Sequence, residues 1–176
     1  VETIQRREMW THSILAVKPL ASSAIMTNNM SVAFTTFALG ITGGLGTIYM
    51  MVLNGVMIGV IGMACWLAGM SVALWSFVAP HGVLELPAIF IAGGAGLRVG
   101  LGLLFPGTLP RRDSLASAGT EAVRLLVGVV PILILAGIIE AFISPTALAP
   151  SLKFRMAAAL FVLLVFYLFR PLESRS

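Results

Sequence analysis

Long apolar stretches dominate the hydrophobic pattern of this chain, and short segments rich in proline, glycine and charged residues separate them. A transmembrane helix needs about 20 mostly apolar residues, so the pattern has room for about five such helices with short connections. The sequence therefore predicts an all-α, polytopic helical membrane protein. The predicted spans cover approximately residues 29–51, 56–78, 83–104, 118–143 and 152–169.

The two ends of the chain are more polar than its middle. Residues 1–26 mix charged residues with short apolar runs, which predicts an amphipathic helix lying at the membrane interface with Trp10 as an anchor. Residues 27–170 form the predicted transmembrane domain, and residues 171–176 form a short tail. Because the chain starts with Val1 and no signal peptide opens it, we expect that an N-terminal part is missing.

The composition supports a membrane protein and argues against a nucleic-acid-binding one. The chain is 59% hydrophobic and only 10% charged, whereas soluble domains are about 25% charged. Its net charge is +4, but the basic residues lie in short segments between apolar runs, where they set membrane orientation. Arg111 and Arg112 fall on the same predicted side as Arg170 and Arg175, which places the C-terminus in the cytoplasm; Lys153 argues against this orientation.

The segment Pro80-His81-Gly82-Val83-Leu84-Glu85-Leu86-Pro87 interrupts this apolar pattern. Proline is unfavourable in a helix interior and fits better in a first helical turn. The segment therefore predicts a broken or re-entrant piece near residues 80–87, followed by a helix. Ionisable residues at membrane depth usually face the protein interior and belong to a site, a pathway or a structural network.

Five polar residues from three spans are expected at one membrane level: Asn28, Asn29, His81, Glu85 and Glu140. The first interpretation is a hydrogen-bonded network in which a carboxylate accepts from His81 and from the asparagine amides. A second is a metal site in which His81, Glu85 and Glu140, with water, bind a divalent ion such as zinc. A shared proton between His81 and a glutamate is a further hypothesis.

Further charged residues and several glycines lie deeper along the spans. Arg98, Glu121 and Arg124 are expected toward the inner side, where Arg98 either extends to the interface or pairs with Glu121. Asn54-Gly55 predicts a tight turn between the first two spans. Small residues allow helices to approach closely, so the third predicted span should be central because of its glycines Gly93, Gly94, Gly96, Gly100 and Gly102.

Several stretches of the sequence resemble the stage II sporulation protein M family. The most specific is Pro80-His81-Gly82-Val83-Leu84-Glu85-Leu86-Pro87-Ala88, which Gly96-Leu97-Arg98 follows. Asn28-Asn29 and Asn54-Gly55-Val56-Met57-Ile58-Gly59 match upstream, and Ala136-Gly137-Ile138-Ile139-Glu140 matches downstream. The resemblance covers roughly residues 28–170. It implies an integral protein of the inner (plasma) membrane that lacks the family's longer N-terminal part and its earlier span.

The resemblance also implies how the protein works. In spore formers the family member acts with two partner membrane proteins, one of them a cell-wall hydrolase, so the favoured interpretation is a non-enzymatic scaffold that recruits envelope-remodelling partners. The glycine-lined spans further predict a homo-oligomer, most simply a dimer. The alternative is a transporter or a metal-dependent membrane enzyme that uses His81, Glu85 and Glu140 at an outward-facing polar site. Unwound helices recur at transport sites, so the predicted break near residues 80–87 favours this alternative.

Overall fold

The structure, a computed structural model, describes residues 18–169, with side chains from residue 27 onward. This part of the chain is helical and contains no strand. Its elements are α2 (Lys18–Ala38), the 3-10 helix η2 (Leu39–Thr42), α3 (Leu45–Leu67), α4 (Ser71–Leu104), α5 (Arg111–Phe142) and α6 (Pro150–Phe169). The predicted all-α class is confirmed. The predicted tail and most of the predicted interfacial helix lie outside the described residues, while residues 18–26 belong to α2.

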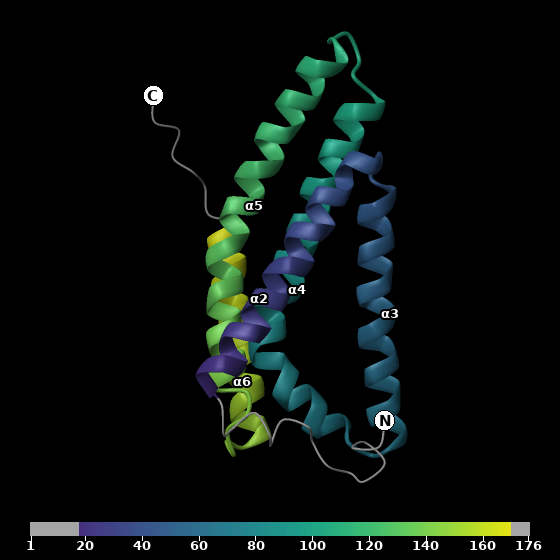
Figure 1. Cartoon of the computed structure of the whole chain (residues 1–176). Coiled ribbons are helices and arrows are strands. Elements are labelled where there is room, and N and C mark those ends of the chain that lie inside the picture. Colours follow the sequence, from purple (N-terminus) through teal and green to yellow (C-terminus); the bar gives the residue numbers. More distant parts are fainter. Residues whose placement is uncertain (1–17, 170–176) are drawn as a thin grey trace, which may run out of the picture.

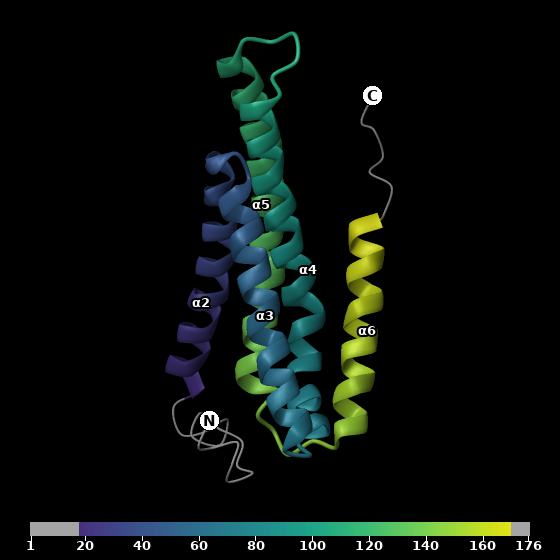
Figure 2. The same ribbon diagram turned by 90° about the vertical axis from the view of Figure 1, so that its right-hand side faces the viewer.

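Four of the described helices, α3 to α6, are long and apolar enough to cross a membrane. The long helices α4 and α5 form an antiparallel hairpin at the centre of the molecule, and α2 packs against both (Figure 1). Helix α6 packs against α4, and Figure 2 shows it on the far side of α4 from α2. Helix α3 leans away from the hairpin along much of its length (Figure 1). The core therefore sits between α2, α4 and α5.

The first two predicted spans do not coincide with helices, and the predicted turn at Asn54-Gly55 is wrong. The chain reverses instead at Gly43 and Gly44, whose φ angles are +71° and +85°, values that glycine adopts without steric cost. Asn54 lies inside α3, where its side-chain Nδ2 donates to the Met50 carbonyl at 2.8 Å. Helix α3 ends at Leu67, and residues 68–70 turn the chain into α4.

The predicted break near residues 80–87 is also wrong. Pro80 and Pro87 both lie inside the continuous helix α4, and α5 likewise runs through Pro131. Each proline removes only one backbone hydrogen bond, whereas an unwound segment would leave several polar backbone groups without partners at membrane depth. The helix bends instead, and Figure 1 shows that α4 changes direction in its early part.

Glycines bring α4 into close contact with the α2–η2–α3 turn, as the glycine-rich sequence of α4 predicted. A Cβ added at Gly40 would clash with the Gly96 carbonyl, and one added at Gly100 would lie 2.6 Å from the Gly44 nitrogen. Buried Thr47 strengthens this contact region, because its Oγ1 donates to the Thr36 carbonyl at 2.7 Å. Helix α4 is therefore held against the turn by direct backbone packing.

Candidate functional site

A cluster of four polar side chains joins α2, α4 and α5. His81 and Glu85 lie one turn apart on α4, a spacing that places both on the same helix face. Asn29 comes from α2 and Glu140 from the last turns of α5. Ligand atoms of His81, Glu85 and Glu140 all lie within 4.8 Å of one another. We call Asn29, His81, Glu85 and Glu140 the polar cluster.

Asn29 connects the two carboxylates of the polar cluster. Its Nδ2 donates to Glu85 Oε1 and, at 3.5 Å, reaches Glu140 Oε2. Glu85 and Glu140 are both partly buried. Carboxylates removed from solvent need hydrogen-bond donors or a compensating positive charge. The single Asn29 amide serves both carboxylates, and it thereby links α2 to the α4–α5 hairpin.

His81 is the most deeply buried member of the polar cluster, with 4% of its surface exposed. Its Nδ1 lies 2.9 Å from the Ser144 hydroxyl, and its Nε2 faces Glu140 Oε1 at 3.9 Å. The Phe77 ring packs edge-on against the imidazole, with a centroid separation of 5.7 Å. Two neighbours therefore fix the ring plane, and the Nε2 edge points into the cluster.

The segment after α5 continues the polar contacts toward α6. Buried Lys153 donates through Nζ to the Ser144 carbonyl at 2.6 Å and to the Thr146 carbonyl at 2.8 Å. Ser144 thus contacts His81 through its hydroxyl and Lys153 through its carbonyl. A continuous series of polar contacts links α2, α4, α5 and the beginning of α6.

The structure brings together four of the five residues that the sequence grouped by depth. The fifth, Asn28, is exposed, and its Nδ2 lies 3.4 Å from Asn29 Oδ1. Sequence reasoning missed Ser144 and Lys153 as parts of the site. The position of Ser144, four residues after Glu140, could have placed it near the same face. Lys153 gave no such signal, because it lies at the start of an apolar helix, where a basic residue ordinarily faces the membrane interface.

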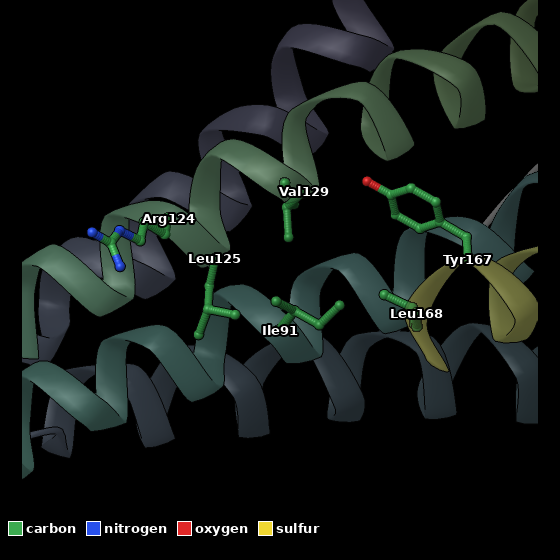
Figure 3. Close-up of a pocket in the computed structure, with 7 residues that line it drawn as sticks. Ile91, Arg124, Leu125, Val129, Tyr167 and Leu168 are labelled. Carbon is green, nitrogen blue, oxygen red and sulfur yellow. The ribbon is translucent and has the colours of Figure 1, made fainter. Parts of the chain in front are cut away.

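Of the three residues predicted toward the inner side, Arg98 and Glu121 form an ion pair, and Arg124 lines a cavity. Arg98 Nε lies 2.8 Å from Glu121 Oε2, so Arg98 pairs across the α4–α5 hairpin, although about half of each side chain is exposed. Arg124 lies one turn beyond Glu121 and lines a cavity of about 550 Å³ between α4, α5 and α6. In Figure 3, Arg124 and Tyr167 occupy opposite ends of this cavity, and apolar side chains lie between them.

Helix α3 carries a second candidate surface. Only 6% of an apolar 18-residue stretch of α3 is buried within the protein, compared with 44% of the corresponding stretches of α4 and α5. Gly55, Gly59 and Gly62 follow one another at helical spacing on one side of α3. A groove of about 360 Å³ runs along this side and is lined by Ile58, Gly59, Gly62, Met63, Trp66 and, from α4, Trp75.

The fold and its apolar helices define a polytopic helical membrane protein. The model of the family described as stage II sporulation protein M matches residues 3–145, and this chain belongs to that family. The chain is also 34% identical over 77 residues to an uncharacterized protein of Methanocaldococcus jannaschii. The match covers 43% of each chain, so less than half of that relative's length is matched. No solved structure matches this chain.

Proposed function

We propose that this protein is a non-enzymatic scaffold of the plasma membrane whose helix α3 associates with other transmembrane helices. The observation that carries the proposal is the low burial of α3, together with the open glycine groove along it. Only 6% of its apolar 18-residue stretch is buried within the protein. An apolar helix can simply face lipid, but lipid contact does not require small residues. Glycines at helical spacing instead allow the backbone of a second helix to approach closely.

The polar cluster supports a scaffold rather than a turnover site. Among the described residues, no fully buried side-chain nitrogen or oxygen lacks a hydrogen-bond partner. Hydrogen bonds between buried side chains of different helices fix those helices relative to one another. The transport alternative drew its support from a predicted break in the helix at residues 80–87, and α4 is continuous there. The polar cluster is therefore best understood as the structural connection that holds α2, α4 and α5 in place while α3 remains available.

The proposed partners follow from the family and from the shape of α3. Family membership favours partners that remodel the cell envelope, a cell-wall hydrolase among them, and a second copy of this chain is the simplest further partner. The Arg98–Glu121 pair near the α4–α5 connection and the basic residues Arg111 and Arg112 favour a cytoplasmic location for that end of the hairpin. The beginning of α6 then lies at the outer side, and its end points back toward the cytoplasm.

Site-specific photo-crosslinking in the membranes of the native host tests this function. A photoreactive residue at position 59 faces the α3 groove, where a Cβ meets no atom within 4 Å. The same residue at position 119 on α5 is the control, because a Cβ there also meets no atom within 4 Å. We expect discrete protein adducts from position 59 that include an envelope-remodelling membrane protein, and none from position 119. Lipid adducts alone at position 59 would refute the proposal.

A further inference from the structure

We propose that His81, Glu85 and Glu140 bind one divalent transition-metal ion, most readily Zn²⁺, which clamps α4 to α5. The three residues offer one imidazole nitrogen and two carboxylate oxygens, a ligand set that zinc uses in proteins. Their ligand atoms already lie within 4.8 Å of one another. This assignment is independent of the scaffold role, because it concerns the interior of the bundle and not the surface of α3.

The separation between His81 and Glu140 is the most informative distance in the cluster. At 3.9 Å, His81 Nε2 and Glu140 Oε1 are too far apart for a hydrogen bond, which would require about 2.7–3.2 Å. Two ligands of one tetrahedral zinc ion lie about 3.3 Å apart, given metal–ligand bonds of about 2.0–2.1 Å. The observed separation therefore leaves space for an ion between the two atoms after a shift of a few tenths of an ångström on each side.

The neighbours of His81 hold its imidazole in an orientation suited to a metal ligand. Metal-binding histidines commonly donate their second ring N–H to an oxygen, which fixes the tautomer and the ring orientation. The Ser144 hydroxyl, 2.9 Å from His81 Nδ1, is placed to accept such a bond. The lone pair of Nε2 then points toward Glu140. The Phe77 ring restricts rotation of the imidazole from another side.

The charge balance also favours a divalent ion. Glu85 and Glu140 are both partly buried, and together they would carry two negative charges. Among the described residues Lys153 is the buried lysine, and its ammonium donates to the Ser144 and Thr146 carbonyls. One divalent ion with two carboxylates and a neutral imidazole forms a site without net charge, which is the least costly arrangement at membrane depth. Water completes the four ligands.

Metal analysis of the purified full chain tests the site. The protein is loaded with Zn²⁺, dialysed, and its monodisperse fraction is measured by elemental mass spectrometry. We expect about one zinc per chain in the wild type and in Glu121→Gln, the control at the exposed pair. We expect at least a tenfold loss in Glu140→Gln and in His81→Ala. Glu140→Gln keeps the side-chain shape, so it separates loss of a ligand from loss of folding.

A thermal readout makes the test independent of metal retention during dialysis. Binding to the folded state alone should raise Tm by roughly 5–10 °C at a hundredfold excess of Zn²⁺ over Kd. EDTA should reverse this rise, and Glu140→Gln should not show it. The proposal is overturned if wild-type protein retains less than a tenth of an equivalent of zinc, or if Zn²⁺ and EDTA leave Tm unchanged. Equal zinc retention by wild type and Glu140→Gln would also overturn it.

Discussion

Asn28 and Asn29 are adjacent residues of the same type, but only Asn29 reaches the polar cluster. Asn29→Ala removes the amide that donates to both Glu85 and Glu140. Leaving a buried polar group without a partner costs about 1–3 kcal/mol, so we expect Asn29→Ala to lower the free energy of unfolding by at least that amount. Denaturant titration in mixed micelles measures it.

Asn28→Ala is the matched control for that experiment, because Asn28 is exposed and, within the described part of the chain, its side chain bonds to neighbouring Asn29. We expect it to change the unfolding free energy by less than about 0.5 kcal/mol. Equal effects of the two substitutions would show that Asn29 does not hold the carboxylates together.

Gly96 and Gly94 distinguish tight from open positions on the same helix. A Cβ at Gly96 would lie 2.6 Å from Thr47 Oγ1 and 2.9 Å from the Thr36 carbonyl oxygen, whereas one at Gly94 meets nothing within 4 Å. Overpacking typically costs about 1–3 kcal/mol, so Gly96→Ala should destabilise the protein by that amount. Gly94→Ala should be neutral or slightly stabilising, since alanine favours helices over glycine. Destabilisation of similar size by both would contradict the packing described for α4.

The sequence predicted most of the polar cluster because ionisable residues are rare in the spans. His81, Glu85 and Glu140 could be recognised individually, and the assumption of alternating spans placed them at one depth with Asn29. The exact contacts could not be predicted, because they depend on helix rotation. The same limit explains Ser144 and Lys153: a serine in a turn and a lysine at a helix start carry no pattern that points inward.

At the scale of secondary-structure elements, hydrophobicity predicted the class of protein better than the ends of its helices. In a chain that is almost uniformly apolar, several glycine-containing positions can form a turn. The sequence favoured Asn54-Gly55, but the chain reverses at Gly43-Gly44, where two successive glycines adopt positive φ angles. Proline was equally ambiguous. Pro80 interrupts the hydrophobic pattern without interrupting helix α4, because a bent helix satisfies more backbone groups than an unwound segment.

Lys153 connects the beginning of α6 to the end of α5. Its two hydrogen bonds to the Ser144 and Thr146 carbonyls involve a charged donor, and such bonds contribute about 1.5–3 kcal/mol. Lys153→Met keeps most of the side-chain length, so we expect it to loosen α6 selectively. Hydrogen exchange measured by mass spectrometry should rise in α6 and in residues 143–149.

Arg155→Met provides the matched control on the same helix, because Arg155 is exposed. It removes one positive charge without removing those two hydrogen bonds. Exchange in α6 should remain as in the wild type. If both substitutions increase exchange equally, the effect comes from the loss of charge, and Lys153 does not anchor the helix.

At the scale of the whole molecule, helices α2, α4 and α5 form a packed body, and helix α3 leaves most of its surface uncovered. Helices α2, α4 and α5 share the core and the polar cluster. Helix α3 contacts the rest chiefly through α4 and the η2 turn, and a Cβ at Gly55 or Gly59 would meet no atom within 4 Å. The scaffold role that we propose uses both features: a rigid body, and a helix that can pack against another protein without disturbing that body.

A substitution at Gly59 alters the surface of α3 without altering the packing of α2, α4 and α5. Gly59→Leu fills the groove beside Trp75 without meeting any described atom within 4 Å of the new Cβ. The substitution should therefore leave folding intact while it prevents close approach of a second helix. Gly119→Leu is the matched control on α5, where the space is equally open.

Self-association in lipid vesicles is the measurement that tests this account most directly. Förster energy transfer between donor-labelled and acceptor-labelled chains should rise with the ratio of protein to lipid for the wild type and for Gly119→Leu. For Gly59→Leu, the apparent affinity of self-association should be at least tenfold lower, which corresponds to about 1.4 kcal/mol. Absence of transfer in the wild type at every ratio, or equal transfer in all three proteins, would contradict the account of α3 as the surface on which a second copy of the chain packs.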